Sequence, residues 1–496
     1  MKFYEIDNAL KEAIIAAEKP IRLRVEIDSG KGFFHSVFEK DIIEANFYGL
    51  KEIAGGTTAR GELIIRNEEL RMTNEGIVPG AEVRVSFSVG EGLPYFQRFV
   101  FYIDDKGVQE IRGHGRKRYV YIGLRDLSVK LRKTDEAKDW SAPAVFTYSV
   151  VCDKTQPEKS IVHGIAQRAG LGVNDIDCST IPVTLPYIKL RKNIWSELSS
   201  LATAYRCHLE CAPEKPLVFA HSPYQSEPLG DNEYSYTFTG SDIFYLRKTA
   251  RAGYYRNTVR LKVNMPVVLE RQEIWRYEDQ PVFYDDTFKP YYPFVHPLVR
   301  VIEIAKYEAS YMIHTTSEKK RNVVYADQID TIEEAESRIE HDGGGFFYSH
   351  YDVTTHHDRA ILTLRKNTDG DLYKASIFGR PIVVDQNRSC FMKDSDEAAT
   401  YGTEALNVTG SYFSEYEVYG KPHYEDWIDR ELAERVQKKR EFTVKTHRAL
   451  FNARVGAKVK IKMKSEELAG TINAFSFRYK RDRAFIAAFK ITENYE

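Results

Sequence analysis

Histidines and carboxylates alternate in one stretch of the sequence, and such residues could bind a metal ion. On a β-strand, alternate side chains point to the same face, so two histidines and two aspartates would share one face here. Histidines two residues apart on a strand can bind zinc together, but this spacing gives His-x-Asp, and no third ligand follows at a diagnostic distance. A solvent-exposed strand face is the favoured interpretation. The residues concerned are His350, Asp352, Thr354, His356 and Asp358.

Two cysteines four positions apart, Cys207 and Cys211, could begin a metal knuckle. On a strand, both would point to the same side as Leu209. The sequence holds no second Cys/His pair that would complete a tetrahedral site. Two ordinary cysteines on the core side of a strand are therefore favoured.

The strongest basic cluster runs from Arg112 to Arg118, with Gly-x-Gly inside it. A phosphate loop needs a strand before the glycines and a helix after them, and here a strand follows. A charged hairpin turn is therefore the preferred interpretation. If such turns lined a channel, they could contact DNA phosphates as it passed. The candidates for that role are Arg112, Arg116, Lys117 and Arg118.

Aromatic residues and four prolines crowd the stretch 275–297. Flat rings can stack on sugars, so this stretch could bind a glycan. The favoured alternative is packing against the fold or against another subunit, because interfaces concentrate aromatic residues at their buried centres. The interface or recognition candidates are Trp275, Tyr277, Tyr291 and Tyr292.

The familiar catalytic and cofactor motifs are missing from the sequence. It contains no G-x-S-x-G elbow, no H-E-x-x-H, no complete Walker A motif and no paired C-x-x-C. Two carboxylates that meet only in space could still form a glycosidase pair. We expect a protein that is not an enzyme, with no catalytic residue, no bound cofactor and no metal ligand.

Composition indicates an ordinary globular chain. Its 496 residues suggest three or four domains, and 71 basic against 72 acidic residues argue against wholesale binding to nucleic acid or membranes. Five cysteines in so long a chain predict a reducing compartment and no disulfide framework. The N-terminus lacks the apolar core of a signal peptide, and no window approaches the roughly twenty apolar residues of a membrane span.

Helical periodicity and a hairpin define one unit between residues 160 and 220. Residues 161–171 carry an apolar stripe that ends at Gly170, where a left-handed residue commonly closes a helix. A second helix is expected over 193–206, with Asn193 as its N-cap. Alternating residues from Cys207 onward, a proline turn and the return strand LVFA (217–220) predict a hairpin. The sequence therefore predicts a small α/β unit.

The sequence of this unit and of the strand that follows it resembles the baseplate hub proteins of bacteriophage tails and related contractile machines. The shared features are Ala169-Gly170-Leu171, the helix from Trp195 to Ala204 and the strand NTVRLKV (257–263). The C-terminus is similar to the way hub chains finish, with a helix that leads into a strand, a Gly-led strand and a closing strand pair. Its segments are EDWIDRELAERVQKKR (425–440), EFTVKT, GAKVKIKM (456–463), GTINAFSFR (470–478) and AFIAAFKI (484–491).

The expected fold class is α+β and mainly β, with two small β-barrel-like domains separated by the α/β unit and an elaborated region in the second half. Short alternating strands and glycine turns before residue 135 predict a barrel or sandwich, and the resemblance implies a barrel. The expected domains are a first barrel (1–145), the α/β unit (146–225), a second barrel (226–270 with 400–496) and its insertion or elaboration (271–399).

The resemblance implies a structural subunit of the baseplate hub. Such chains form homotrimeric rings that close the tail tube, adapt its sixfold symmetry to a threefold tip and open for genome delivery. The implied partners are the distal tail or tail tube protein, the tape-measure protein and a spike or fibre protein, with transient contact with DNA in the channel. The implied location is the virion tail tip, after synthesis in the host cytoplasm. A tail-associated cell-wall-degrading glycosidase or peptidase, and a carbohydrate-binding attachment module, remain as alternatives.

Overall fold

The structure is a computed structural model, and it describes most of the chain outside the region between residues 263 and 389. Within that region only strand segments are described, without their side chains. The described residues are 3–16, 20–28, 34–37, 39–51, 56–66, 77–112, 118–133, 145–190, 193–221, 234–250, 255–263, 266–268, 272–278, 299–304, 312–314, 320–327, 350–355, 360–365, 374–384, 389–410, 412–413, 417–418, 421–436, 440–464, 466–481 and 485–493.

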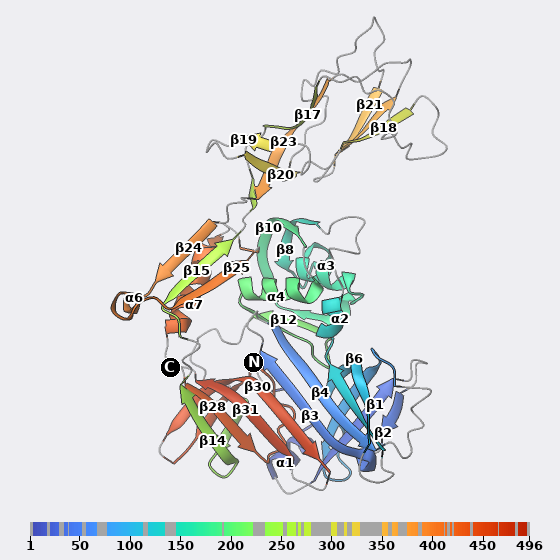
Figure 1. Ribbon diagram of the computed structural model, residues 1–496, viewed down its shortest axis with the longest axis vertical. Helices are drawn as coiled ribbons and strands as arrows, with labels where there is room; N and C mark the ends of the chain where they lie inside the picture. The colour runs from blue at the N-terminus through green and yellow to red at the C-terminus, as the bar shows by residue number, and fades with distance from the viewer. Residues whose placement is uncertain are drawn as a thin grey trace, which may run out of the picture.

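One large, mostly antiparallel sheet of sixteen described strands dominates the fold and occupies one end of the molecule (Figure 1). Eleven of these strands lie side by side along its main path. In spatial order they are β14 (Ile243–Ala250), β28 (Arg440–Thr446), β31 (Ile486–Glu493), β30 (Glu467–Lys480), β3 (Ile42–Lys51), β4 (Gly56–Arg66), β7 (Arg118–Arg125), β6 (Phe96–Arg112), β5 (Glu82–Val89), β1 (Ile21–Asp28) and β2 (Phe34–Val37).

Strands from the two ends of the chain meet in the middle of this sheet. β3 pairs with β30 in antiparallel register, which places Phe47 opposite Phe477. Two further strands, β13 (Tyr236–Thr239) and β29 (Lys458–Lys462), join the C-terminal side. The two β-rich parts expected to form separate barrels therefore share one continuous sheet.

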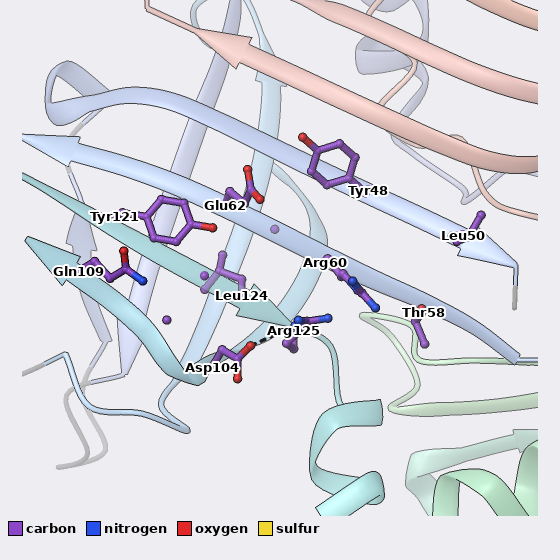
Figure 2. A pocket seen from close by; sticks show the side chains of 13 residues that line it. Tyr48, Leu50, Thr58, Arg60, Glu62, Asp104, Gln109, Tyr121, Leu124 and Arg125 are labelled. Atoms are coloured by element: carbon purple, nitrogen blue, oxygen red, sulfur yellow. Dashed lines mark hydrogen bonds and ion pairs between the residues drawn. The ribbon is translucent and has the colours of Figure 1, made fainter. Parts of the chain in front are cut away.

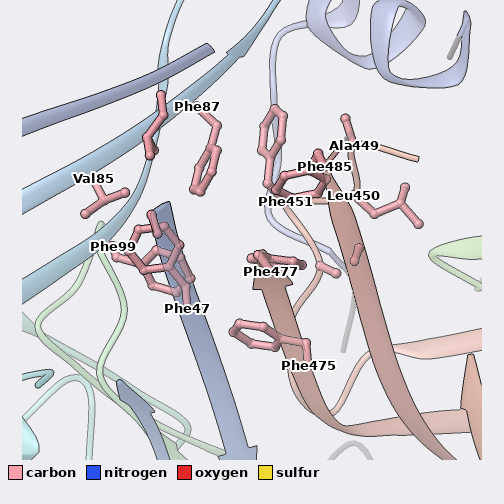
Figure 3. Packing of buried hydrophobic residues seen from close by; sticks show 14 of the residues in the cluster. Phe47, Val85, Phe87, Phe99, Ala449, Leu450, Phe451, Phe475, Phe477 and Phe485 are labelled. Atoms are coloured by element: carbon pink, nitrogen blue, oxygen red, sulfur yellow. The ribbon is translucent and has the colours of Figure 1, made fainter. Parts of the chain in front are cut away.

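They also share one hydrophobic core (Figure 3). Alternation along the strands places one side chain in two inside, so β1 buries Leu23, Val25 and Ile27. Phenylalanine rings fill the space between the N-terminal and C-terminal strands. Phe87 stacks on Phe451 with centroids 5.2 Å apart. The helix α1 (Asn8–Ala16) packs its apolar face on the same core.

The helices of the α/β unit are α2 (Ser128–Lys133), α3 (Ile161–Arg168) and α4 (Ile194–Ala204), and its strands are β8 (Val145–Cys152), β9 (Ile176–Cys178), β10 (Ile181–Lys189), β11 (Cys207–Glu210) and β12 (Leu217–His221). The unit contains the two predicted helices (α3, α4) and the predicted hairpin (β11, β12), together with a helix and three strands that the sequence did not predict.

Local sequence signals set the ends of its helices. The Asn193 side chain accepts a hydrogen bond from Ser196 N at 2.9 Å, and Gly170 has a φ of +80°, which confirms both predicted caps. The Ser160 side chain caps the N-terminus of α3. This cap was not predicted from the sequence.

A three-stranded sheet packs beside this unit. It contains β15 (Thr258–Val263) between β24 (Ser389–Asp394) and β25 (Ala405–Gly410), and α6 (Asp396–Tyr401) links the last two. The sequence predicts β15 and residues 400–436 as parts of the second barrel (226–270 with 400–496). The buried residues of β15 instead belong to the core of the α/β unit. The reason is that α7 (His423–Val436) packs on β15 and on the C-terminus of α4.

Side chains of α7 satisfy the last carbonyl groups of α4. Trp427 Nε1 donates to Thr203 O at 3.0 Å, and His423 Nε2 lies 2.9 Å from Ala204 O. Arg206 just beyond α4 pairs with Glu434 at 2.7 Å. A helix end needs such partners when it is buried, so these contacts fix α7 on the α/β unit.

The region predicted as an insertion leaves and re-enters the fold at neighbouring strand ends, because Val263 lies opposite Ser389. Figure 1 places its strands at the far end from the large sheet. They are β16 (Pro266–Val268), β17 (Gln272–Glu278), β18 (Val299–Ile304), β19 (Met312–His314), β20 (Lys320–Asp327), β21 (His350–Thr355), β22 (Ala360–Arg365) and β23 (Lys374–Val384). The short pair β26 (Glu417–Val418) and β27 (Lys421–Pro422) precedes α7.

Candidate functional site

The structure locates only part of each predicted site. Trp275 and Tyr277 lie on β17, whose side chains are not described, and Tyr291 and Tyr292 lie outside the described residues. Trp275 is paired with Ile377 of β23 in the strand register, so this part of the aromatic stretch is regular strand.

The basic cluster lies where a hairpin was predicted. Arg112 ends β6 and Arg118 begins β7, and the two residues are paired in the register. Arg116 and Lys117 lie outside the described residues, so whether this turn faces a channel stays a prediction. In the His350 stretch, β21 ends at Thr355, and His356 and Asp358 also lie outside the described part.

A hollow of about 570 Å³ lies on the outer face of the large sheet (Figure 2). Its walls come from β3, β4, β6 and β7, whose outward-facing side chains alternate with core residues such as Phe47. The labelled lining residues are Tyr48, Leu50, Thr58, Arg60, Glu62, Asp104, Gln109, Tyr121, Leu124 and Arg125.

A β-bulge creates the depth of this hollow. The register of β6 against β7 shifts between Ile103 and Val108, which leaves the residues between them without regular partners. Gly107 and Gly123 face each other there, and a Cβ atom on Gly107 would lie 2.6 Å from Gly123 O. Only glycine at Gly107 permits this close approach of the two strands.

The polar groups of the hollow are balanced in charge. Arg125 Nε pairs with Asp104 Oδ2 at 3.2 Å, while Arg60 and Glu62 add one charge of each sign. Burial and the nearby Glu62 carboxylate raise the pKa of Tyr48 and Tyr121, so both phenols remain hydrogen-bond donors. Among the lining residues, no hydroxyl or thiol nucleophile is paired with a histidine base.

A second group of charged residues is buried where the α/β unit joins the large sheet. β11 pairs in parallel with the start of β4, which places Glu210 beside Thr57. Glu210 is 4% exposed and forms an ion pair with Arg454, and His208 Nε2 lies 3.0 Å from its other oxygen. Tyr4 Oη donates to the same carboxylate at 3.4 Å.

Arg98 completes this group, which we call the buried junction: Tyr4, Arg98, His208, Glu210 and Arg454. The Arg98 guanidinium donates to Phe451 O and Ala453 O, both at 2.8 Å, and lies 4.5 Å from the centre of the Tyr4 ring. Burial alone would raise the pKa of Glu210, but the charges and hydrogen bonds of His208 and Arg454 lower it to about 2. The carboxylate is thus ionised at neutral pH and joins three parts of the chain.

A third polar group lies inside the α/β unit. Cys152, His163 and Cys178 bring their ligand atoms within 4.8 Å of one another and are the residues that could hold a metal ion in the described part of the chain. From the sequence no metal ligand is expected, and the cysteines whose spacing could begin a metal site are Cys207 and Cys211. Cys207 is buried on β11, as predicted, whereas Cys211 lies just beyond the end of that strand and is half-buried.

Comparison with known proteins identifies structural neighbours but no sequence relatives. No protein-family model and no curated protein matches the chain. The tail protein of Neisseria meningitidis MC58 is similar in fold, with a TM-score of 0.48 and 9% identity over 96% of this chain and 97% of that chain. The 43 kDa tail protein of prophage MuSo2 from Shewanella oneidensis has a TM-score of 0.47 and 10% identity over 95% and 98% of the two chains.

The prophage tail protein gp18 of Listeria monocytogenes has a TM-score of 0.42 and 9% identity over 95% and 94%. These three structural neighbours are tail proteins, two of them from prophages. Their class agrees with the family that the sequence resembles. In the part of the chain that the structure describes, no helix has the length and apolar character needed to cross a membrane.

Proposed function

We propose that the chain is a structural subunit of a phage tail baseplate hub, located at the virion tail tip. Three copies would form a ring that closes the tail tube, adapts its sixfold symmetry to a threefold tip and opens for genome delivery. Its partners would be the tail tube or distal tail protein, the tape-measure protein and a spike or fibre. This role needs no catalytic residue.

The pairing of β3 with β30 is the observation that carries the proposal. It joins an N-terminal set of strands to a C-terminal set in one sheet, and we take these sets to be the two barrel-like domains. Three chains would then supply six sets of strands around a ring. A threefold assembly could thus present a pseudo-sixfold surface to a sixfold tube.

The ends of the sheet favour head-to-tail assembly. β14 lies at one end of the described path and β2 at the other. β14 is an exposed strand, and its Phe244 and Tyr245 are 49% and 40% exposed. Unpaired strand edges readily pair with a neighbouring chain, and a head-to-tail contact between two different edges closes into a ring when the rotation permits.

Negative-stain microscopy together with mass measurement in solution tests the proposal. We expect a trimeric ring with a central opening. A chain that stays monomeric at micromolar concentration would refute the ring.

A pair of matched variants tests which edge forms the contact. Phe244→Asp places a charge on β14 and should shift the trimer towards monomers. Met392→Asp makes the same change at a side chain that is 58% exposed on β24, in a different sheet, and should leave the trimer intact. If the trimer remains as intact with Phe244→Asp as with Met392→Asp, β14 does not form the interface.

A further inference from the structure

Three potential metal ligands converge in the core of the α/β unit, and the hub role does not use them. Cys152 ends β8, His163 lies in the first turn of α3, and Cys178 ends β9. They are 0%, 2% and 5% exposed, and their ligand atoms all lie within 4.8 Å of one another. Three separate elements therefore direct sulfur and nitrogen atoms to one point.

The His163 ring is held in a fixed orientation. Its Nδ1 lies 2.8 Å from Ser160 Oγ, and Ser160 is itself the N-cap of α3. This contact leaves Nε2 facing Cys178 Sγ at 4.0 Å. A ligating histidine usually has its second nitrogen fixed by such a hydrogen bond, which sets the tautomer and the ring angle.

The spacing of the group suits an ion better than it suits direct contact. Zn–S distances of about 2.3 Å and Zn–N distances of about 2.0–2.1 Å place the two ligand atoms about 3.6 Å apart around a tetrahedral ion and about 3.8 Å apart around a trigonal one. The observed 4.0 Å needs only a small side-chain rotation to match. As a hydrogen bond between a neutral thiol and an imidazole, the same distance is weak.

The charges of the three residues suit the same ion. Two thiolates carry a charge of −2 and the imidazole is neutral, so their complex with a divalent cation would be neutral within an apolar core. The surrounding side chains include Val151, Ile161 and Val162, which are fully buried. Without an ion, Cys152 has Cys178 and Ser160 as hydrogen-bonding partners, and His163 has Ser160.

We propose that Cys152, His163 and Cys178 bind one zinc ion that fastens β8, α3 and β9 together. Both thiols lose their protons to solvent on binding, and a water molecule takes the fourth position. The site goes beyond the proposed hub function, because it stabilises the α/β unit whether or not the chain forms a ring.

Metal binding by the reduced full-length chain tests the site. Co²⁺ serves as the spectroscopic probe and Zn²⁺ as the competitor. We expect a thiolate-to-cobalt charge-transfer band that saturates at one equivalent and disappears when Zn²⁺ is added. Zn²⁺ should also raise the thermal unfolding temperature of the chain.

Matched variants separate this site from other thiols. Cys178→Ser and His163→Gln should each weaken binding at least tenfold and abolish the thermal shift. Cys211→Ser removes a thiol of the same unit outside the group and should change neither result. Circular dichroism and thermal unfolding without metal show whether each variant is folded.

Two results would overturn the proposal. One is the lack of a thiolate-to-cobalt band in wild-type chain whose thiols titrate as reduced. The other is a disulfide between Cys152 and Cys178 that forms under mild oxidation as fast with Zn²⁺ as without it, because bound zinc must protect both thiols.

Discussion

The strand β4 contacts two groups of charged residues that differ in what surrounds them. Its start borders the buried junction, where Glu210 is 4% exposed and has its partners within the chain. Its middle supplies Arg60 and Glu62 to the hollow, whose polar groups face outward. The same residue types therefore make buried contacts within the fold at one end of the strand and face outward in the hollow a few residues later.

Exposure to solvent explains why the charged residues of the junction and those of the hollow differ in their contribution to stability. A buried carboxylate must be paired because its desolvation costs several kcal/mol, so the junction cannot lose one member without leaving another uncompensated. An ion pair at the surface, such as Arg125 with Asp104, is worth about 0–1 kcal/mol because water screens both charges. Mutations at the junction should therefore reduce the stability of the fold much more than mutations in the hollow.

The largest expected effect comes from removing the central carboxylate of the junction. Glu210→Ala leaves Arg454 and Arg98 buried without their counter-charge, and we expect a loss of about 3–5 kcal/mol in the free energy of unfolding. Glu62→Ala in the hollow is the matched control, with an expected loss below about 1 kcal/mol. Urea unfolding followed by circular dichroism measures both. Similar losses in the two variants would show that the junction and the hollow do not differ.

The pH dependence of stability gives a second, smaller contrast. The pKa of Glu210 is lowered to about 2 in the folded chain, so the unfolded chain takes up this proton first as the pH falls. The stabilisation is complete above the unfolded pKa of about 4.5 and is lost between there and about pH 2, up to about 3 kcal/mol. Unfolding in urea at several acidic pH values, for wild type and Glu210→Gln, measures it. Parallel curves for the two proteins would contradict the assignment.

Local signals in the sequence predicted α3, α4 and the β11–β12 hairpin of the α/β unit, and the elements of the C-terminus. The caps of α4 and α3 at Asn193 and Gly170 and the strands β28 to β31 depend on residues close in sequence, and the structure confirms them. The union of β3 with β30 could not be foreseen, because it joins residues more than 400 positions apart. The hollow likewise depends on a bulge in β6, for which Gly107 was the only local signal.

The buried junction and the group of Cys152, His163 and Cys178 were not predicted, because their members are also far apart in the sequence. Alternation from Cys207 onward predicted one buried and one polar face, yet His208 and Glu210 are buried as well. The second face is covered by Tyr4 and Arg454, which come from the two ends of the chain. The group of Cys152, His163 and Cys178 has no compact spacing in the sequence, because three elements assemble it. Contacts between residues so far apart in the sequence can be identified only from the folded structure.

The smallest expected effect comes from removing one hydroxyl group, either in the buried junction or in the hollow. Tyr4→Phe removes the hydroxyl that donates to Glu210, and burial followed by the Glu210 charge raises the pKa of that phenol to about 12, so it is a donor at neutral pH. We expect a loss of about 1 kcal/mol in the free energy of unfolding, since the carboxylate keeps Arg454. Tyr48→Phe makes the same change at a ring that is 40% exposed in the hollow and should cost almost nothing. Urea unfolding measures both variants. A larger loss in the free energy of unfolding for Tyr48→Phe than for Tyr4→Phe would mean that the hollow contributes more to stability than the junction hydroxyl does.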